Sequence, residues 1–324
     1  MLGQEMEARK RNTDKLPDKS IVDFFERGTP ITRLIKSRSP LNERRLYILG
    51  VAKRYFSLKE FLVLMLPLSV CSSKSLYLRR QREVFNLEAR DELGDYLSAD
   101  GSVNLFGRAF HMPDRLDALT LVLHVALADQ YHARKFIKKD SVVIDAGANI
   151  GPFSVLAAHL APEGHVYVFE PAAGTFSFLE TNAKGYSNLT CFNAGLGEAA
   201  AEKKLLNRGV GHLGNVIEDS PLCKQLGAGS GNWEKVAVTT IDEFVSRNRI
   251  ARFDFLKIDT EGYEARILRG AAESIKTFRP IIAMSAYHNP EDKTELPKLL
   301  RSIDCDYICE LYRDVEEHFI CHAN

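Results

Sequence analysis

The chain has 324 residues, of which 45% are hydrophobic and 27% are charged, the ordinary composition of a globular protein. Lysine plus arginine and aspartate plus glutamate each number 43, so the formal net charge is zero and a general electrostatic attraction to nucleic acid or membranes is excluded. A chain of this length usually forms two units or one core with a large extension.

The first unit that we predict is a mainly helical, basic N-terminal extension over residues 1–110. Between Arg27 and Arg82 there are 13 lysines or arginines but only two acidic residues, Glu43 and Glu60. This basic stretch is either a solvated face or a docking surface for an anionic partner, such as a lipid surface or an acyl-carrier protein.

The same region shows no sign of a secretion signal or a membrane span. Residues 1–19 are polar and charged, without the apolar core of a signal peptide. The longest apolar run, over residues 61–70, is shorter than the about 20 residues that a membrane span takes, and Pro67 interrupts it. We interpret this run as a buried helix and expect a cytoplasmic protein without a transmembrane segment.

Residues 111–324 are predicted to form the second unit. An apolar-striped helix is expected over residues 116–137, and from Ser141 onward strand-like and helix-like segments alternate. Strands are predicted at 141–145, 165–170, 189–193, 236–240, 253–259 and 280–287, helices at 151–160, 175–184, 264–277 and 293–302, a closing hairpin at 306–312 and 318–322, and a loop-rich excursion at 202–233. The predicted fold class is α/β, with a doubly wound, mostly parallel sheet of seven strands that ends in an antiparallel hairpin.

Six cysteines are scattered along the chain without a framework spacing, which favours reduced thiols. Cys305, Cys309 and Cys321 lie near His318 and His322, but a zinc site needs four converging ligands. In a strand, His318 and His322 would point to one face and Cys321 to the other. We therefore expect buried thiols in the terminal hairpin.

A glycine turn, Asp145-Ala-Gly-Ala-Asn-Ile-Gly151, follows the first predicted strand of the sheet. The dinucleotide fingerprint G-x-G-x-x-G brings backbone close to a pyrophosphate, and this turn, with only Gly147 and Gly151, lacks that spacing. The D-x-G-x-x-x-G form suits a cofactor without phosphates. Gly147 would then approach a methionine group, and Asp145 would engage its ammonium group directly or through water. A structural turn in any α/β protein is the alternative.

Two further strand ends extend this candidate site. Glu170 ends the second strand, where a carboxylate can accept hydrogen bonds from both hydroxyls of a ribose. Asn193 and Ala194 end the third strand in the small-residue stretch Asn193-Ala-Gly-Leu-Gly197, which leaves room for an adenine ring. An ordinary strand-to-turn junction explains that stretch equally well.

The fourth main strand ends in Lys257-Ile-Asp-Thr-Glu-Gly262. Asp259 lies at the sheet edge where such folds bind ligands and is placed to meet the methionine group or the acceptor. Lys257 shares a strand face with Asp259, and we expect it to pair with a buried carboxylate. Glu261 and Glu264 precede or enter a helix, whose dipole favours acidic residues there.

Asp145-Ala-Gly-Ala-Asn-Ile-Gly151, Phe169-Glu-Pro171 and Lys257-Ile-Asp-Thr-Glu-Gly262 together resemble the FkbM family of methyltransferases, over about residues 105–323. The resemblance implies a class I methyltransferase fold, S-adenosylmethionine as cofactor, and O-methylation of a hydroxyl on a sugar, glycolipid or polyketide-type natural product. It implies cofactor binding by Asp145, Gly147, Asn149, Gly151 and Glu170. The chain departs from many members at the end of the fifth strand, where it reads Met284-Ser-Ala-Tyr-His288.

Methyl transfer to an alcohol needs in-line alignment and a base for the hydroxyl proton. His288 is the first candidate base, because it follows the fifth strand and imidazole titrates near neutrality. A hydrogen-bonded loop histidine is the alternative, and Asp259 and Glu261 are the rival bases. We expect His288→Ala to keep cofactor affinity and to lower turnover at least about tenfold. No metal site is expected, although the two carboxylates leave a metal-dependent variant open, which chelation would test.

Two other functions are alternatives to methyl transfer. A non-catalytic cofactor-binding or scaffolding protein would keep the fold and bind S-adenosylmethionine without transfer. An NAD-linked oxidoreductase is disfavoured by the glycine spacing. The expected partner is a small-molecule or glycan acceptor, and no nucleic acid is expected.

Overall fold

A computed structural model describes residue 98 and residues 100–113, 116–211, 214–225, 231–313 and 316–324. The chain divides into two units, residues 1–110 and residues 111–324, and each is described by itself. In the first unit, the described residues form an antiparallel hairpin of β1 (Val103–Leu105) and β2 (Arg108–Phe110). The predicted basic helices and the apolar run of the N-terminal extension lie outside the described residues.

The second unit is built on a sheet of seven strands in the order β12-β13-β11-β10-β3-β4-β5. Their bounds are β3 Val142–Ala146, β4 His165–Phe169, β5 Leu189–Phe192, β10 Phe255–Ile258, β11 Ile281–Ser285, β12 Tyr307–Arg313 and β13 Glu317–Ala323. Strands β3, β4, β5, β10 and β11 pair in parallel, whereas β13 pairs antiparallel with both β11 and β12. The predicted α/β fold class, with a mostly parallel sheet and a terminal hairpin, is confirmed.

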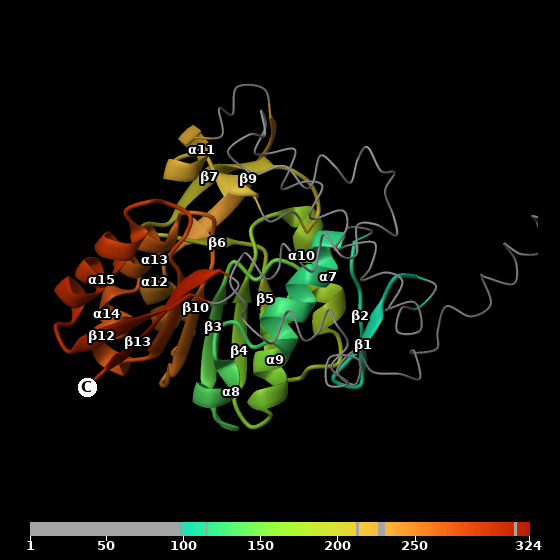
Figure 1. The fold of residues 1–324 in the computed structure, drawn as a ribbon, viewed down its shortest axis with the longest axis horizontal. Helices are drawn as coiled ribbons and strands as arrows, with labels where there is room; N and C mark the ends of the chain where they lie inside the picture. The colour runs from blue at the N-terminus through green and yellow to red at the C-terminus, as the bar shows by residue number, and fades with distance from the viewer. Residues whose placement is uncertain (1–97, 99, 114–115, 212–213, 226–230, 314–315) are drawn as a thin grey trace, which may run out of the picture. The chain divides into compact units, whose positions relative to one another are not determined.

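Helices cover both faces of this sheet. One group contains η2 (Val122–Leu127), α8 (Ala133–Phe136), α9 (Pro152–Leu160) and α10 (Ala173–Ala183), and the other contains α12 (Ile241–Arg247), α13 (Glu264–Arg269), α14 (Ala272–Phe278) and α15 (Asp292–Ile303). Figure 1 shows the two groups on opposite sides of the sheet. Because both faces are covered, the central strands β3 and β10 are buried along nearly their whole length, and each is apolar except for one charged residue, Asp145 in β3 and Lys257 in β10. Among the described residues, no helix is both long and apolar enough to cross a membrane.

The predicted helix over residues 264–277 is interrupted between α13 and α14. The break falls at Gly270, where a Cβ atom would overlap the carbonyl oxygen of Gly197. The missing side chain therefore allows a close backbone contact that helical periodicity alone does not reveal.

A second sheet, in the order β6-β9-β7-β8, lies where we predicted a loop-rich excursion over residues 202–233. It contains β6 (Gly195–Leu196), β7 (Ala201–Asn207), β8 (Val216–Ile217) and β9 (Asn232–Thr239), and the short helix α11 (Pro221–Gln225) follows β8. The prediction is wrong here. Strand β7 buries Leu205 and Leu206 but opens with the charged residues 202–204, so its apolar signal is confined to one end.

The predicted continuous helix over residues 116–137 is also wrong. Helix α7 (Leu116–Leu121) runs into η2, and a turn then separates η2 from α8. Asp129 and His132 in this turn have φ values of 56° and 55°, outside the helical range. The Asp129 carboxylate accepts hydrogen bonds from the backbone N–H groups of Ala133 (2.7 Å) and Arg134 (3.0 Å), which caps α8.

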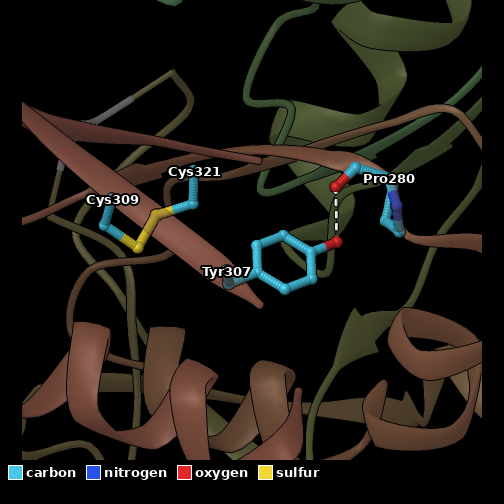
Figure 2. Close-up of a disulfide and its surroundings, with 4 residues drawn as sticks. All are labelled: Pro280, Tyr307, Cys309 and Cys321. Atoms are coloured by element: carbon cyan, nitrogen blue, oxygen red, sulfur yellow. Dashed lines mark hydrogen bonds between the residues drawn. A yellow bond between two sulfur atoms is a disulfide. The ribbon is translucent and has the colours of Figure 1, made fainter. Parts of the chain in front are cut away.

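Strands β12 and β13 form the C-terminal hairpin, as predicted, and Cys309 lies directly opposite Cys321. Their Cα atoms are 4.1 Å apart and their sulfur atoms form a disulfide, which Figure 2 shows. The expectation of reduced thiols is therefore wrong for this pair. Alternation along β13 gives the face of Cys321 but not the register with β12 that brings Cys309 to it.

We predict that Cys309→Ser lowers the free energy of unfolding in non-reducing buffer by about 3 kcal/mol, the chain-entropy value for a closed loop of roughly 15 residues. Denaturant unfolding with and without dithiothreitol measures this, and the difference from the wild type should vanish under reduction. Cys305→Ser, which removes an exposed free thiol, is the matched control. Equal stability of the wild type and Cys309→Ser in non-reducing buffer would contradict the prediction.

Candidate functional site

A cleft of about 830 Å³, its open mouth included, lies at the carboxyl edge of β3, β4 and β10. Open α/β sheets bind their ligands at this edge. The lining residues come from β10 and the turns after these strands, from α7, η2, the turn after η2 and α9, and from the second sheet and the segment before β8: Leu121, Val125, Tyr131, Gly147, Ala148, Asn149, Pro152, Phe153, Glu170, Pro171, Gly195, Leu196, Leu205, Asn215, Ile217, Lys257, Asp259, Thr260, Glu261 and Tyr263.

The glycine turn after β3 is fixed by its neighbours on both sides. The backbone N–H groups of Gly147 and Ala148 both donate to the carbonyl oxygen of Phe169, at 3.0 Å. Gly147 has φ of 75°, and a Cβ atom there would overlap the carbonyl oxygen of Asp259 and lie 2.8 Å from Thr260 Cγ2. Glycine is therefore required because the turn packs directly against the end of β10.

Glu170 presents a preorganised carboxylate to the cleft. Its Oε2 atom accepts a hydrogen bond from the Asn149 N–H (3.0 Å), and its Oε1 atom accepts one from the Ala172 N–H (2.9 Å). Burial raises the pKa of Glu170 to about 7, although both backbone hydrogen bonds and the charge of Lys257 oppose the rise. The side chain thus has a fixed orientation and changes charge near neutral pH.

Asp145 and Lys257 form a buried ion pair beneath the turn. Lys257 Nζ lies 3.1 Å from Asp145 Oδ1 and donates to the carbonyl oxygen of Gly147 at 2.6 Å. The Ser154 hydroxyl donates to Asp145 Oδ2 at 2.6 Å. The expected pairing of Lys257 with a carboxylate is confirmed. Asp145 is fully buried and does not line the cleft, so in this structure it supports the turn from below.

Asp259 lies in the cleft wall with a hydroxyl donor on each carboxylate oxygen. The Ser285 hydroxyl donates to Oδ1 and the Tyr131 hydroxyl donates to Oδ2, both at 2.8 Å. Burial would raise the pKa of Asp259, but the charges of Lys257 and His288 and the two hydroxyl groups outweigh it, and the pKa lies below its ordinary value. Asp259 is therefore ionised at neutral pH.

His288 lies behind the cleft, surrounded by three carboxylates. Its Nδ1 atom is 3.0 Å from Glu264 Oε1, and its Nε2 atom is 3.5 Å from Glu261 Oε2 and 3.7 Å from Asp259 Oδ1. Burial lowers the pKa of His288, but the carboxylate charges, that of Glu264 above all, raise it to about 10. At neutral pH the imidazole is thus a buried cation, and its 2% exposed side chain does not line the cleft.

Glu261 does line the cleft. It has φ of 56°, in the turn between β10 and α13. Burial raises its pKa to about 8; the positive charge of His288 opposes this rise, and the charges of Asp259 and Glu264 add to it. Of the two cleft carboxylates near His288, Glu261 and Asp259, Glu261 is therefore the one whose pKa lies closer to neutral pH.

Within the described residues, donor atoms of Asp259, Glu264 and His288 lie within 4.8 Å of one another, a spacing that a divalent cation could bridge. Oε1 of Glu264, however, already accepts hydrogen bonds from the backbone N–H groups of Thr260 (2.9 Å) and Gly262 (3.3 Å). The imidazolium of His288 supplies the positive charge that these carboxylates need. The three side chains therefore form a buried charge network in which His288 is the cation.

The structure brings together five of the predicted site residues on the cleft wall: Gly147, Asn149, Glu170, Asp259 and Glu261. Gly151, Asn193 and Ala194 lie outside the lining. The Asn193 amide donates to the carbonyl oxygens of Glu170 (2.9 Å) and Pro171 (3.0 Å), so it shapes the turn after β4. The wall that we expected at Asn193 and Ala194 is made two residues later, by Gly195 and Leu196.

Sequence reasoning missed the contributions of Tyr131, Tyr263 and the second sheet to the cleft. Leu205 and Ile217 come from strands β7 and β8, which the loop-rich prediction left out. Tyr131 falls within the apolar-striped helix predicted over residues 116–137, a pattern that indicates packing only. The one feature of the sequence that could have indicated a role in the site is the polar hydroxyl group of Tyr131, in a segment that leads into the first strand of the predicted sheet.

The chain is similar in sequence to known methyltransferases. A family model described as the methyltransferase FkbM domain matches residues 145–309, just over half of the chain. The chain is 29% identical over 162 residues to the 31-O-demethyl-FK506 methyltransferase FkbM of Streptomyces tacrolimicus, covering 43% of this chain and 62% of that protein. It is 24% identical over 163 residues to the hexuronic acid methyltransferase AglP of Haloferax volcanii, covering 49% of this chain and 62% of that protein. The chain thus spans less than two thirds of the length of these curated relatives.

Among solved structures, the chain is similar to the methyltransferase FkbM from Methylobacillus flagellatus KT. The TM-score is 0.43 and the sequence identity 21%, over 74% of this chain and 59% of that one.

Proposed function

The chain belongs to the FkbM family of methyltransferases, and from this we propose that it transfers a methyl group from S-adenosylmethionine to a hydroxyl of a small molecule, a sugar or glycan, or a natural product. The observation that carries the proposal is the placement of Glu170 and of the pair Asp259 and Glu261 in one cleft. Strands β4 and β10 flank β3, so these carboxylates follow strand ends that are separated by two strand spacings, roughly 10 Å.

The residues of the cleft fit S-adenosylmethionine. Glu170, held by two backbone N–H groups, offers its remaining acceptor capacity to the ribose hydroxyls. Leu196, Leu205 and Ile217 supply an apolar wall for the adenine ring. The ionised Asp259 carboxylate suits the positively charged methionine end of the molecule. Asp145, Gly151 and Asn193 would then contribute by supporting the turns that carry these groups.

When bound, S-adenosylmethionine supplies a methyl group on a positively charged sulfur. Glu261 would take the hydroxyl proton as the acceptor oxygen receives the methyl group, and the electron pair of the broken carbon–sulfur bond would stay with sulfur. We propose Glu261 rather than His288 as the base, because His288 is protonated at neutral pH and lies behind the cleft wall. The imidazolium of His288 lies 3.5 Å from Glu261 and 3.7 Å from Asp259, and its expected tenfold effect on turnover stays a prediction.

The transfer is tested by incubating the purified full chain with S-adenosylmethionine and panels of hydroxyl acceptors. A product heavier by a methylene group, formed together with S-adenosylhomocysteine, supports the proposal, and unchanged activity in chelator excludes a metal requirement. Comparison of metabolites and glycans between producing and deletion strains identifies the acceptor. Tight cofactor binding without any methylated product would instead favour the non-catalytic scaffold.

A docking role for the basic stretch between Arg27 and Arg82 also remains a proposal. It rests on the excess of basic residues in the sequence alone. Deletion of residues 1–85 should spare cofactor binding if the stretch only recruits an anionic partner, and lost cofactor binding would make it structural.

Cofactor affinity should rise with pH through about 7. Only the ionised form of Glu170 keeps all of its acceptor sites for the ribose hydroxyls, and its pKa in the free protein is about 7. Calorimetric titration with S-adenosylhomocysteine between pH 6 and pH 8 measures this, and Glu170→Gln should bind weakly and lose the pH dependence. Wild-type affinity that stays constant across this range would contradict the assignment of Glu170.

A further inference from the structure

Tyr131 reaches the candidate site from outside the segment that the family model covers. It precedes residue 145, where that match begins, and lies in the turn between η2 and α8. Its side chain is buried, with 1% of its surface exposed, yet it lines the cleft. We propose that Tyr131 is a positioning residue that holds the Asp259 carboxylate in place for methyl transfer, a role that rests on the proposed function.

The hydroxyl groups of Tyr131 and Ser285 clamp Asp259 from two sides. Tyr131 donates to Oδ2 and Ser285 donates to Oδ1, each at 2.8 Å, and the two hydroxyl oxygens are 3.5 Å apart. The three side chains come from the turn before α8 and from the ends of β10 and β11. Rotation of the carboxylate would break both hydrogen bonds, so its orientation is fixed before any ligand binds.

The ring of Tyr131 is itself held in place. Its edge-to-face contacts are with Phe153 on α9 (ring centroids 5.8 Å apart, interplanar angle 86°) and with His318 on β13 (5.7 Å, 70°). Lys257 Nζ lies 5.7 Å from the ring centroid. The capped turn at Asp129 fixes the backbone on one side of the residue, so the hydroxyl has little freedom to leave Asp259.

The two hydroxyl groups add to the charges of Lys257 and His288, which together hold the pKa of Asp259 below its ordinary value despite burial. The charged and titratable groups that face this carboxylate are Lys257, His288, Glu261, Glu316, Tyr131 and Tyr287. Lys257 is already occupied by Asp145 and two backbone carbonyl groups, and His288 is bound to Glu264. The two hydroxyl groups are therefore the donors that contact Asp259 directly.

Tyr131→Phe tests the role, because it removes the hydroxyl group and keeps the ring. We expect the NMR titration midpoint of the Asp259 carboxyl to move to higher pH by about one unit and turnover to fall about tenfold. Tyr307→Phe is the matched control: Tyr307 is equally buried and donates to the Pro280 carbonyl oxygen at 2.6 Å, away from the cleft (Figure 2). Tyr307→Phe should lower stability about as much as Tyr131→Phe does, but it should leave the Asp259 midpoint and turnover unchanged.

Site-specific replacement of Tyr131 by 3-fluorotyrosine provides a second measurement that does not depend on the stability of Tyr131→Phe. The more acidic hydroxyl donates a stronger hydrogen bond, so the Asp259 midpoint should move to lower pH. An Asp259 midpoint that neither change moves overturns the inference. Failure of the proposed function is seen separately, as a wild-type protein that does not bind S-adenosylmethionine while its Asp259 midpoint still responds to Tyr131→Phe.

Discussion

Glu261→Gln is expected to lower turnover by about 10²- to 10⁴-fold, the usual contribution of a positioned base, while cofactor affinity stays nearly unchanged. Glu261 is the cleft carboxylate beside the buried imidazolium, and glutamine keeps its shape but cannot accept the proton. Single-turnover kinetics together with calorimetric binding separate the two effects. Glu295→Gln, a change at an exposed carboxylate on α15, is the matched control and should leave both quantities unchanged.

The pH profile gives this prediction a second readout. A base must be ionised to accept a proton, and the pKa of Glu261 is about 8, so wild-type turnover should rise with pH to a plateau above about 8. The residual activity of Glu261→Gln should not show this rise with pH. A variant that retains wild-type turnover and the same rise with pH would remove Glu261 from the mechanism and return attention to Asp259.

Gly147→Ala is expected to abolish detectable cofactor binding and to destabilise the protein. The new methyl group meets the carbonyl oxygen of Asp259, and φ of 75° adds a backbone cost of about 1–2 kcal/mol for a residue with a Cβ atom. Because the contact joins the glycine turn to the end of β10, relief of the clash displaces Asp259 and the turn together.

Gly107→Ala is the matched control for this change. Gly107 has φ of 79°, and a Cβ atom there would meet nothing within 4 Å. Gly107→Ala therefore has the same unfavourable positive φ but no steric clash, and it should bind cofactor normally. Thermal unfolding and titration with S-adenosylmethionine measure both variants, and normal binding by Gly147→Ala would show that the turn is not packed as described.

Most of the fold could be predicted because the central strands carry their signal locally. Strands β3 and β10 are mostly apolar, and Gly147 and Asp259 follow them directly at the ligand edge. Strand β7 was missed because only Leu205 and Leu206 are buried while its first half is charged. The break in the predicted helix over 116–137 depends on the positive φ values of Asp129 and His132, which periodicity cannot register.

Site residues such as Glu170 and Asp259 could be predicted because each lies at the end of a predicted strand, at the edge of the sheet where ligands bind. The site was not predictable where contacts join distant segments. Tyr131 and Asp259 are 128 positions apart and meet only in the folded chain. The same holds for His288: its place after β11 was visible in the sequence, but the three surrounding carboxylates that keep it protonated were not.

We propose that the cleft at the ends of β3, β4 and β10 binds S-adenosylmethionine. Calorimetric titration of the full chain with S-adenosylmethionine, and separately with NADH, tests it most directly. Saturable binding of S-adenosylmethionine at one site, lost in Glu170→Ala and absent for NADH, is the predicted result. Tight binding of NADH with none of S-adenosylmethionine would contradict the account.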